Sequence, residues 1–206
     1  VDFKTTGNFE TKKGISIKSI LDKRFKDKKT ANEFLTKCIN KEFSVTSIEK
    51  KPGKKTPSAP FTTSTLQQAA GGRLGFAVDR TMKAAQKLYE GGHISYMRTD
   101  SVILSEDAIK AISSEIKSKY GDKYLMNRVF KSKAKNAQEA HEAIRPTHME
   151  NMTAGNDSDE QRLYELIWKR FIACQMSSAR VAKTTIKIAG QNESVILKNE
   201  ELKEFT

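Results

Sequence analysis

The sequence predicts an α+β fold in which a mainly helical domain is inserted between two segments of one β-rich domain. Three observations support this: β-branched runs near both ends, apolar residues at helical spacing in the middle, and a lysine- and proline-rich stretch between the first two regions. We place the β-rich segments at 1–56 and 183–206 and the helical domain at 57–182. Segments of 56 and about 24 residues are each small to fold alone, so a single shared domain fits better than three independent ones.

The first segment carries both strand and helix signals. Residues 43–50, FSVTSIEK, are typical of a strand, whereas residues 30–40, TANEFLTKCIN, have helical spacing. The predicted apolar face of that helix consists of Phe34, Leu35 and Cys38. The following stretch, KKPGKKTPSAP at 50–60, holds three prolines, one glycine and four lysines. We expect no regular element there and place the first domain boundary in it.

The helical domain opens with a capping signal. Ser64 and Gln67 in STLQ have the spacing of a capping box, which predicts a helix that begins near Thr65. A second helix is predicted within 76–92, FAVDRTMKAAQKLYEGG, and its glycine pair should end it. The apolar stripe of this second helix is Val78, Met82, Ala85 and either Leu88 or Tyr89.

Two more helices follow. Residues 104–121 offer Ser105 as N-cap, acidic residues in the first turn and a terminal glycine, and residues 158–176 open with Ser158 and Gln161 at capping-box spacing. The expected inward side chains are Ile109, Ile112 and Ile116 in the first, and Leu163, Ile167, Trp168 and Phe171 in the second. Because the two aromatic residues share this stripe, we interpret them as core rather than as base-stacking platforms.

The C-terminal segment returns to a strand pattern. KTTIKIAG at 183–190 and ESVILK at 193–198 are short β-branched runs, and Gly-Gln-Asn at 190–192 is a turn signal between them. These runs are the second part of the predicted β-rich domain.

The charge is strongly positive. Lysine and arginine number 37 against 25 acidic residues, for a net charge of +12 and a pI near 9.6, so a polyanion such as nucleic acid is the first partner to consider. Residues 1–60 hold 15 basic and 7 acidic residues, a surplus of eight that either follows phosphates or is a solvated surface. No apolar run approaches the ~20 residues of a membrane span and no signal pattern opens the chain, so we expect a soluble intracellular protein without a membrane partner.

Cysteine and histidine spacings indicate no metal site. Cys38 and Cys174 belong to no CxxC or Cys/His cluster, and we expect both to be reduced. His93, His141 and His148 are scattered, so no metal ligand is predicted in this sequence.

The stretch HISYMRTDSVIL at 93–104, between two predicted helices, should be extended with a turn. Tyr96, Arg98 and Asp100 then share one face. A phenol with a pKa near 10 is a poor nucleophile at neutral pH, but an adjacent guanidinium stabilises the phenolate and binds phosphate, and a carboxylate can orient that guanidinium. This is the set that tyrosine attack on a phosphodiester requires. The alternative is a packing tyrosine beside a surface ion pair.

Four strings in order carry a family resemblance: PFTTSTLQQAA (60–70), LGFAVDRTMKAAQKLYEGG (74–92), ISYMRTDS (94–101) and AQEAHEAIRPT (137–147). Together they closely resemble the type IA DNA topoisomerases, the bacterial enzymes in particular. The similarity runs from about Pro60 to Gln175 and is weaker in the flanks, which would form part of the family's β-rich arch domain.

The resemblance implies roles for specific residues. Tyr96 would be the nucleophile that becomes linked to a 5′ phosphate and leaves a free 3′ hydroxyl, and Arg98 would bind the phosphate and stabilise the transition state. Asp100 and His141 would support the site, His141 as a hydrogen-bond donor near the scissile phosphate. Further candidates for DNA contact are Thr99, Ser101 and Arg145.

Some of these residues also have a plain structural interpretation. QEAHEAIRP at 138–146 is typical of a helical turn stopped by Pro146, in which His141 is a surface residue and Glu142 pairs with Arg145. The hydroxyls of FTTSTLQQ at 61–68 suit phosphate contact, but helix capping explains them better.

The resemblance also implies partners and a cofactor. The intact enzyme would cleave one strand of DNA, pass a strand and reseal without ATP, relaxing negatively supercoiled DNA in the bacterial cytoplasm and nucleoid. Its Mg²⁺ would be bound by a Toprim domain elsewhere in the same polypeptide, since no DxD-type acidic cluster occurs here, and this fragment alone would be nearly inactive. The rival hypotheses are a non-catalytic module that binds single-stranded nucleic acid, and a hinge or scaffold without useful DNA affinity.

Overall fold

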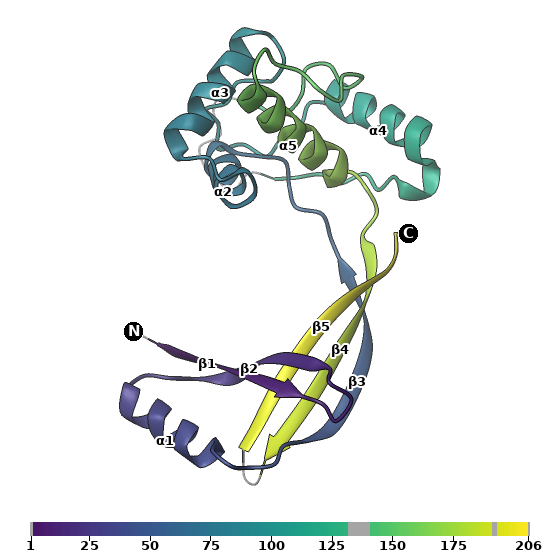
Figure 1. Cartoon of the computed structure of the whole chain (residues 1–206). Helices are drawn as coiled ribbons and strands as arrows, with labels where there is room; N and C mark the ends of the chain where they lie inside the picture. The colour runs from purple at the N-terminus through teal and green to yellow at the C-terminus, as the bar shows by residue number, and fades with distance from the viewer. Residues whose placement is uncertain (1, 132–140, 191–192, 206) are drawn as a thin grey trace. The chain divides into compact units, whose positions relative to one another are not determined.

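The computed structural model describes residues 2–131, 141–190 and 193–205, and it confirms the α+β class. It divides into two compact units: one consists of residues 2–55 and Ala179–Glu204, and the other of Thr56–Ser178 (Figure 1). The predicted turn at 190–192 includes residues that lie outside the described part of the chain.

The first unit is a five-stranded sheet in the order β1-β2-β5-β4-β3. Its strands are β1 (Phe3–Glu10), β2 (Ser16–Phe25), β3 (Ser44–Lys55), β4 (Ala179–Gly190) and β5 (Glu193–Phe205). β1 pairs with β2, β2 with β5 and β3 with β4, all antiparallel. The two strands that follow the helical unit therefore join the sheet begun by the first 55 residues.

Helix α1 (Lys28–Cys38) packs on β1 and β2. Asp27 caps it by accepting a hydrogen bond from the Thr30 amide at 2.8 Å. Its buried face is Ala31 and Phe34, which join Leu21, Phe25 and the partly buried Cys38 in a small core. Leu35, predicted on this face, is exposed instead, because it is one residue removed from Phe34 and so is turned about 100° around the helix.

The prediction that residues 50–60 form no regular element is wrong for the first half of the stretch. β3 continues through Pro52 and Gly53 to Lys55, with Pro52 opposite Ala182 in the register. β3 is the last strand in the sheet order, and an edge strand has a side without a partner, so proline can be accommodated there without the loss of a ladder hydrogen bond.

The second unit is a helical bundle. Its elements are α2 (Thr63–Leu74), α3 (Val78–Glu90), α4 (Glu106–Tyr120), a short 3₁₀ helix (Asp122–Tyr124) and α5 (Ser158–Cys174). α5 packs against α2, α3 and α4 and is the central helix (Figure 1). As predicted, its inward side chains Leu163, Ile167, Trp168 and Phe171 are buried, and each contributes roughly 1.5–3 kcal/mol on burial.

Two of the predicted caps are displaced. α2 is capped by Thr62, whose backbone N–H donates to Thr65 Oγ1 at 2.9 Å while Thr62 Oγ1 accepts from the Thr65 amide, so threonine takes the role expected of Gln67 and the helix begins at Thr63. α5 is capped by Asp157, not Ser158, because the Asp157 carboxylate accepts from two first-turn amides at the positive end of the helix dipole. The Ser105 cap of α4 is confirmed.

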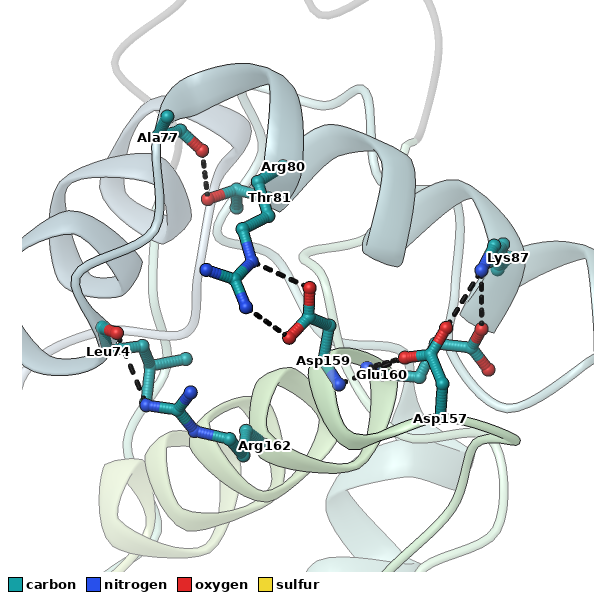
Figure 2. A network of polar contacts seen from close by, with 9 residues as sticks. All are labelled: Leu74, Ala77, Arg80, Thr81, Lys87, Asp157, Asp159, Glu160 and Arg162. Carbon is teal, nitrogen blue, oxygen red and sulfur yellow. Dashed lines mark hydrogen bonds and ion pairs between the residues drawn. The ribbon is translucent and has the colours of Figure 1, made fainter.

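Three ion pairs join α3 to the start of α5 (Figure 2). Arg80 donates to both oxygens of Asp159 at 2.6 and 2.7 Å, and Lys87 donates to Asp157 at 2.8 Å and lies 3.3 Å from Glu160. The hydrogen bond from Lys87 is the main reason that the pKa of Asp157 falls to about 2. We call these five residues the α3–α5 clamp.

On α3 itself, Ala85 and Leu88 are buried and Met82 packs partly buried against the core. Val78, predicted on the same stripe, is the first residue of the helix and is 56% exposed. Tyr89, the alternative to Leu88, is turned outward and 41% exposed.

Candidate active site

The candidate site begins where α3 ends. The Gly91 amide donates to the Lys87 carbonyl at 2.8 Å and the His93 amide to the Leu88 carbonyl at 2.9 Å. A Cβ on Gly91 would lie 3.0 Å from the His93 ring, and Gly92 has φ +73°, so both positions favour glycine. The chain leaves this turn toward Tyr96.

The next residues alternate between the core and the surface, as side chains on the two faces of an extended segment can. Met97 and Thr99 are buried, at 2% and 6% exposure, whereas Tyr96, Arg98 and Asp100 are exposed. The Tyr96 side chain is 42% exposed, far more than a packing tyrosine. Its ring is therefore available to a partner.

The start of α2 is hydrogen bonded to this segment. The Thr63 hydroxyl donates to the Met97 carbonyl at 2.8 Å and accepts from the Thr99 amide at 2.8 Å, while the Thr63 amide donates to the Thr99 carbonyl at 2.9 Å. The hydroxyls of Thr62 and Thr63 are thus used for capping and for holding the Tyr96 segment. This agrees with the capping interpretation of the sequence.

Residues 143–145, which follow His141, are also hydrogen bonded to the Tyr96 segment. Ser95 donates its amide to the Arg145 carbonyl at 2.8 Å and its hydroxyl to the Ala143 carbonyl at 2.7 Å, and it accepts from the Arg145 amide at 2.9 Å. The Ile144 amide donates to the Phe61 carbonyl at 2.8 Å. Three segments far apart in the sequence, near residues 61–63, 95–99 and 143–145, therefore meet at the base of Tyr96.

The predicted helical turn at 138–146 is wrong for its described part. Residues 141–146 are extended, with isolated bridges from Ile144 to Phe61 and from Pro146 to Ile94. The backbone groups of this piece form hydrogen bonds with two neighbouring segments instead of with one another, as they would in a helical turn. Residues 138–140 lie outside the described part. His141 is exposed, at the start of this extended piece.

Glu142 and Arg145 form the predicted ion pair. Arg145 donates from Nε and Nη2 to Glu142 Oε2 at 2.9 and 2.6 Å, and the Ser105 amide donates to Glu142 Oε1 at 2.7 Å. Burial raises the pKa of Glu142, but the hydrogen bonds from Ser105 and Arg145 outweigh it and leave the pKa below its ordinary value. Arg145, a candidate for DNA contact, is thus engaged within the unit.

The remaining candidates differ in exposure. Thr99 is buried and its hydroxyl accepts from the Ser101 amide at 3.0 Å; the Ser101 hydroxyl accepts from the Ile103 amide at 3.1 Å. Among the residues that the structure describes, neither Arg98 nor Asp100 forms an ion pair, so Asp100 does not orient Arg98 here. Arg98 is exposed.

One neighbour of Tyr96 has no counterpart among the predicted site residues. The ring of Tyr89 lies edge-on to the ring of Tyr96, with centroids 5.2 Å apart and planes at 64°. The sequence did offer one indication of an exposed Tyr89. Only one of Leu88 and Tyr89 can lie on the apolar stripe of the helix, so the other must point away from the core. Its proximity to Tyr96 depends on the tight glycine turn between them.

Metal and membrane features are limited. In the described ranges, no group of three or more His, Cys, Asp or Glu side chains is placed to hold a metal ion. Nor is any helix of the described part both long and apolar enough to cross a membrane.

Comparison with known proteins identifies the family to which the chain belongs. A family model described as DNA topoisomerase matches residues 2–205, and the chain therefore belongs to the DNA topoisomerase family, as a type IA fragment. DNA topoisomerase 1 of Rickettsia felis is 47% identical over 186 residues, which cover 84% of this chain and 24% of that protein. DNA topoisomerase 1 of Pasteurella multocida is 50% identical over 157 residues, which cover 74% and 18%.

A solved structure is similar as well. Full-length topoisomerase I from Thermotoga maritima superposes with a TM-score of 0.67 at 32% identity and covers 98% of this chain and 35% of that one. The chain spans about a quarter or less of the length of the two curated relatives.

Proposed function

We propose that this chain supplies the nucleophile of a type IA DNA topoisomerase, and that Tyr96 is that nucleophile. The observation that carries the proposal is a 42% exposed tyrosine held where three distant segments are hydrogen bonded together. Arg98 is exposed on the same face of the segment. The β-rich unit and the helical unit correspond, in this proposal, to part of the arch domain and to the tyrosine domain.

The proposed reaction is a reversible transesterification. Tyr96 Oη attacks the phosphorus of a single-stranded DNA phosphodiester and its proton leaves, while the bond from phosphorus to the 3′ oxygen breaks and that oxygen takes up a proton. The product is a 5′-phosphotyrosine ester with a free 3′ hydroxyl. Resealing is the reverse reaction and needs no ATP, because one phosphoester replaces another.

Arg98 and His141 would stabilise the negative charge on the phosphate in this reaction. A guanidinium binds two phosphate oxygens at once and stabilises the charge that grows on them in the transition state. His141, exposed beside the paired segment 143–145, would donate a hydrogen bond to the same phosphate. Asp100 keeps a supporting role in the proposal through its negative charge near Arg98, without a direct ion pair.

Mg²⁺ has no fitting ligand set in the described part of this chain, so no step above uses the ion. We assign the ion to carboxylates elsewhere in the full polypeptide, and we expect this chain alone to form little adduct. The proposed substrates are single-stranded DNA and negatively supercoiled duplex DNA in the bacterial nucleoid.

Covalent trapping tests the proposal. The full-length protein, its Tyr96→Phe variant and this chain alone are incubated with a 3′-labelled single-stranded oligonucleotide and Mg²⁺, then separated on a denaturing gel. We expect a labelled adduct with the full-length protein, none with Tyr96→Phe and little with the chain alone. An adduct that survives in Tyr96→Phe, or no adduct from a folded, DNA-binding full-length protein, would reject Tyr96 as nucleophile.

A second candidate function, binding of the DNA backbone by the β-rich unit, is favoured by one observation. Lys50, Lys51, Lys54 and Arg180 line a hollow of about 690 Å³ on β3 and β4, and Lys54 lies opposite Arg180 in the register. Like charges directly opposite each other destabilise a strand pair, and a bound phosphate would relieve that repulsion. Lysines also discourage edge-to-edge pairing of sheets, so DNA binding has to be measured.

A further inference from the structure

We propose that Tyr89 is a positioning residue that holds the ring of Tyr96 in the orientation needed for attack. This inference rests on the proposed role of Tyr96 as nucleophile. Its starting point is the edge-to-face contact of the two rings, 5.2 Å between centroids and 64° between planes. That geometry lies in the favoured range for aromatic pairs, in which the positive edge of one ring meets the negative face of the other.

The backbone on both sides of Tyr96 is already fixed. Ser95 is held by its three hydrogen bonds to Ala143 and Arg145, and the Met97 carbonyl accepts from the Thr63 hydroxyl while its side chain is buried. The remaining freedom of Tyr96 is rotation of its own side chain about χ1 and χ2. A half-exposed ring would sample several rotamers in water, so a ring contact decides where its hydroxyl points.

The Tyr96 segment supplies little of that contact itself. Arg98 is exposed, and Met97 and Thr99 are turned to the opposite, buried side. The ring of Tyr89 comes from a different element, the last turn of α3, and is itself 41% exposed. Its outward position is explained by the contact with Tyr96 better than by the core, which Leu88 occupies at 0% exposure.

Tyr89 is in turn held in place. Lys87, two residues earlier, is anchored to Asp157 and Glu160 at the start of α5 (Figure 2). Leu88 is fully buried, and the Gly92 amide donates to the Tyr89 carbonyl at 2.9 Å. The α3–α5 clamp and the glycine turn therefore give Tyr89 a defined position from which it can restrain another ring.

The size of the effect follows from the type of contact. Edge-to-face aromatic pairs favour one arrangement by an amount that corresponds to roughly two- to tenfold in an equilibrium or a rate. Loss of the Tyr89 ring should lower the rate of covalent adduct formation by that factor. It should leave DNA affinity nearly unchanged, because orientation of the nucleophile is needed for the chemical step rather than for binding.

The test compares four full-length proteins: the unsubstituted protein, Tyr89→Phe, Tyr89→Leu and a matched control, Tyr120→Leu. Tyr120 has the same 41% exposure and, like Tyr89, lies in the last turn of a helix of this unit, α4. For each we would measure the adduct rate at saturating oligonucleotide, the dissociation constant for the same oligonucleotide and the thermal unfolding temperature.

We expect Tyr89→Leu to lose roughly two- to tenfold in adduct rate, and Tyr89→Phe and Tyr120→Leu to keep the rate of the unsubstituted protein. Equal rates for Tyr89→Leu and the unsubstituted protein would overturn the proposal. An equal loss in Tyr89→Phe would also overturn it, because the hydroxyl and not the ring would then be required.

Two further outcomes are separable. In the first, Tyr89→Leu and Tyr120→Leu show the same loss of adduct rate and the same fall in unfolding temperature. That outcome would show a general structural effect and reject the positioning role. Failure of the unsubstituted protein to form any adduct would reject the role of Tyr96 itself.

Discussion

Glu142 provides the sharpest test of how the site is held together. It links three parts of the helical unit: its carboxylate accepts from the amide of Ser105, the N-cap of α4, and from two nitrogens of Arg145, whose own amide is bonded to Ser95. Glu142→Ala removes all three carboxylate hydrogen bonds at once. The variant should therefore loosen both the start of α4 and the segment that follows His141.

The magnitude can be worked from these contacts. Hydrogen bonds to a charged group contribute about 1.5–3 kcal/mol each when well buried. The Glu142 and Arg145 side chains keep 26% and 20% exposure, so water replaces part of the loss and about 2–3 kcal/mol in total is expected for Glu142→Ala. For a domain of this size that corresponds to a fall of roughly 5–15 °C in unfolding temperature.

Thermal unfolding of the full-length protein followed by circular dichroism, together with the adduct assay, would check this. The matched control is Glu165→Ala, which breaks an exposed i,i+4 pair with Lys169 on α5 and should cost at most about 0.5 kcal/mol. Glu142→Gln keeps an acceptor for the Ser105 amide and should fall between the two. If Glu142→Ala unfolds within 2 °C, roughly, of the Glu165 control, the reasoning is refuted, since an exposed pair alone accounts for so small a change.

Two predictions concern charge. Because the pKa of Asp157 is lowered from 3.8 to about 2, the stability from its clamp contact is complete above about pH 4 and is lost as pH falls toward 2. Lys87→Met should therefore destabilise the protein at pH 6 and lose its effect near pH 2; a destabilisation independent of pH would contradict this. On the β-rich unit, the double variant Lys54→Gln, Arg180→Gln should weaken DNA binding and reduce the slope of log affinity against log salt by about 1–2. The control is the double variant Lys28→Gln, Lys29→Gln on α1. Equal slopes for the two double variants would exclude the hollow as a phosphate site.

Local patterns sufficed for much of the fold. The spacing of Leu163, Ile167 and Phe171 gave the buried face of α5 because one helix face repeats every three to four residues. Alternation in the extended segment predicted that Tyr96, Arg98 and Asp100 would share one face, and in the structure all three are exposed while Met97 is buried on the other side. The chemical roles of Tyr96 and Arg98 stay predictions until the adduct is measured.

Contacts between distant segments could not be predicted from the sequence. Nothing in the pattern around Glu142 indicates that it accepts from the Ser105 amide, 37 residues away. The strand through Pro52 was missed because only the position of β3 at the sheet edge makes proline acceptable there. The sequence predicted the helices that Thr62 and Asp157 cap, but not the capping residues themselves. Neighbouring residues can each act as the N-cap, and local geometry selects among them.

The convergence of three segments beneath Tyr96 has a consequence for folding. The hydrogen bonds between Thr63 and Thr99 close a loop of 36 residues, and those between Ser95 and Arg145 close one of 50. Such contacts cost chain entropy before they stabilise anything, so they form after the local helices do. The site should assemble late, and its mutually hydrogen-bonded segments should open together. In hydrogen exchange, the amides of Ser95 and Thr99 should then share one free energy of opening, although the tyrosine between them faces the solvent.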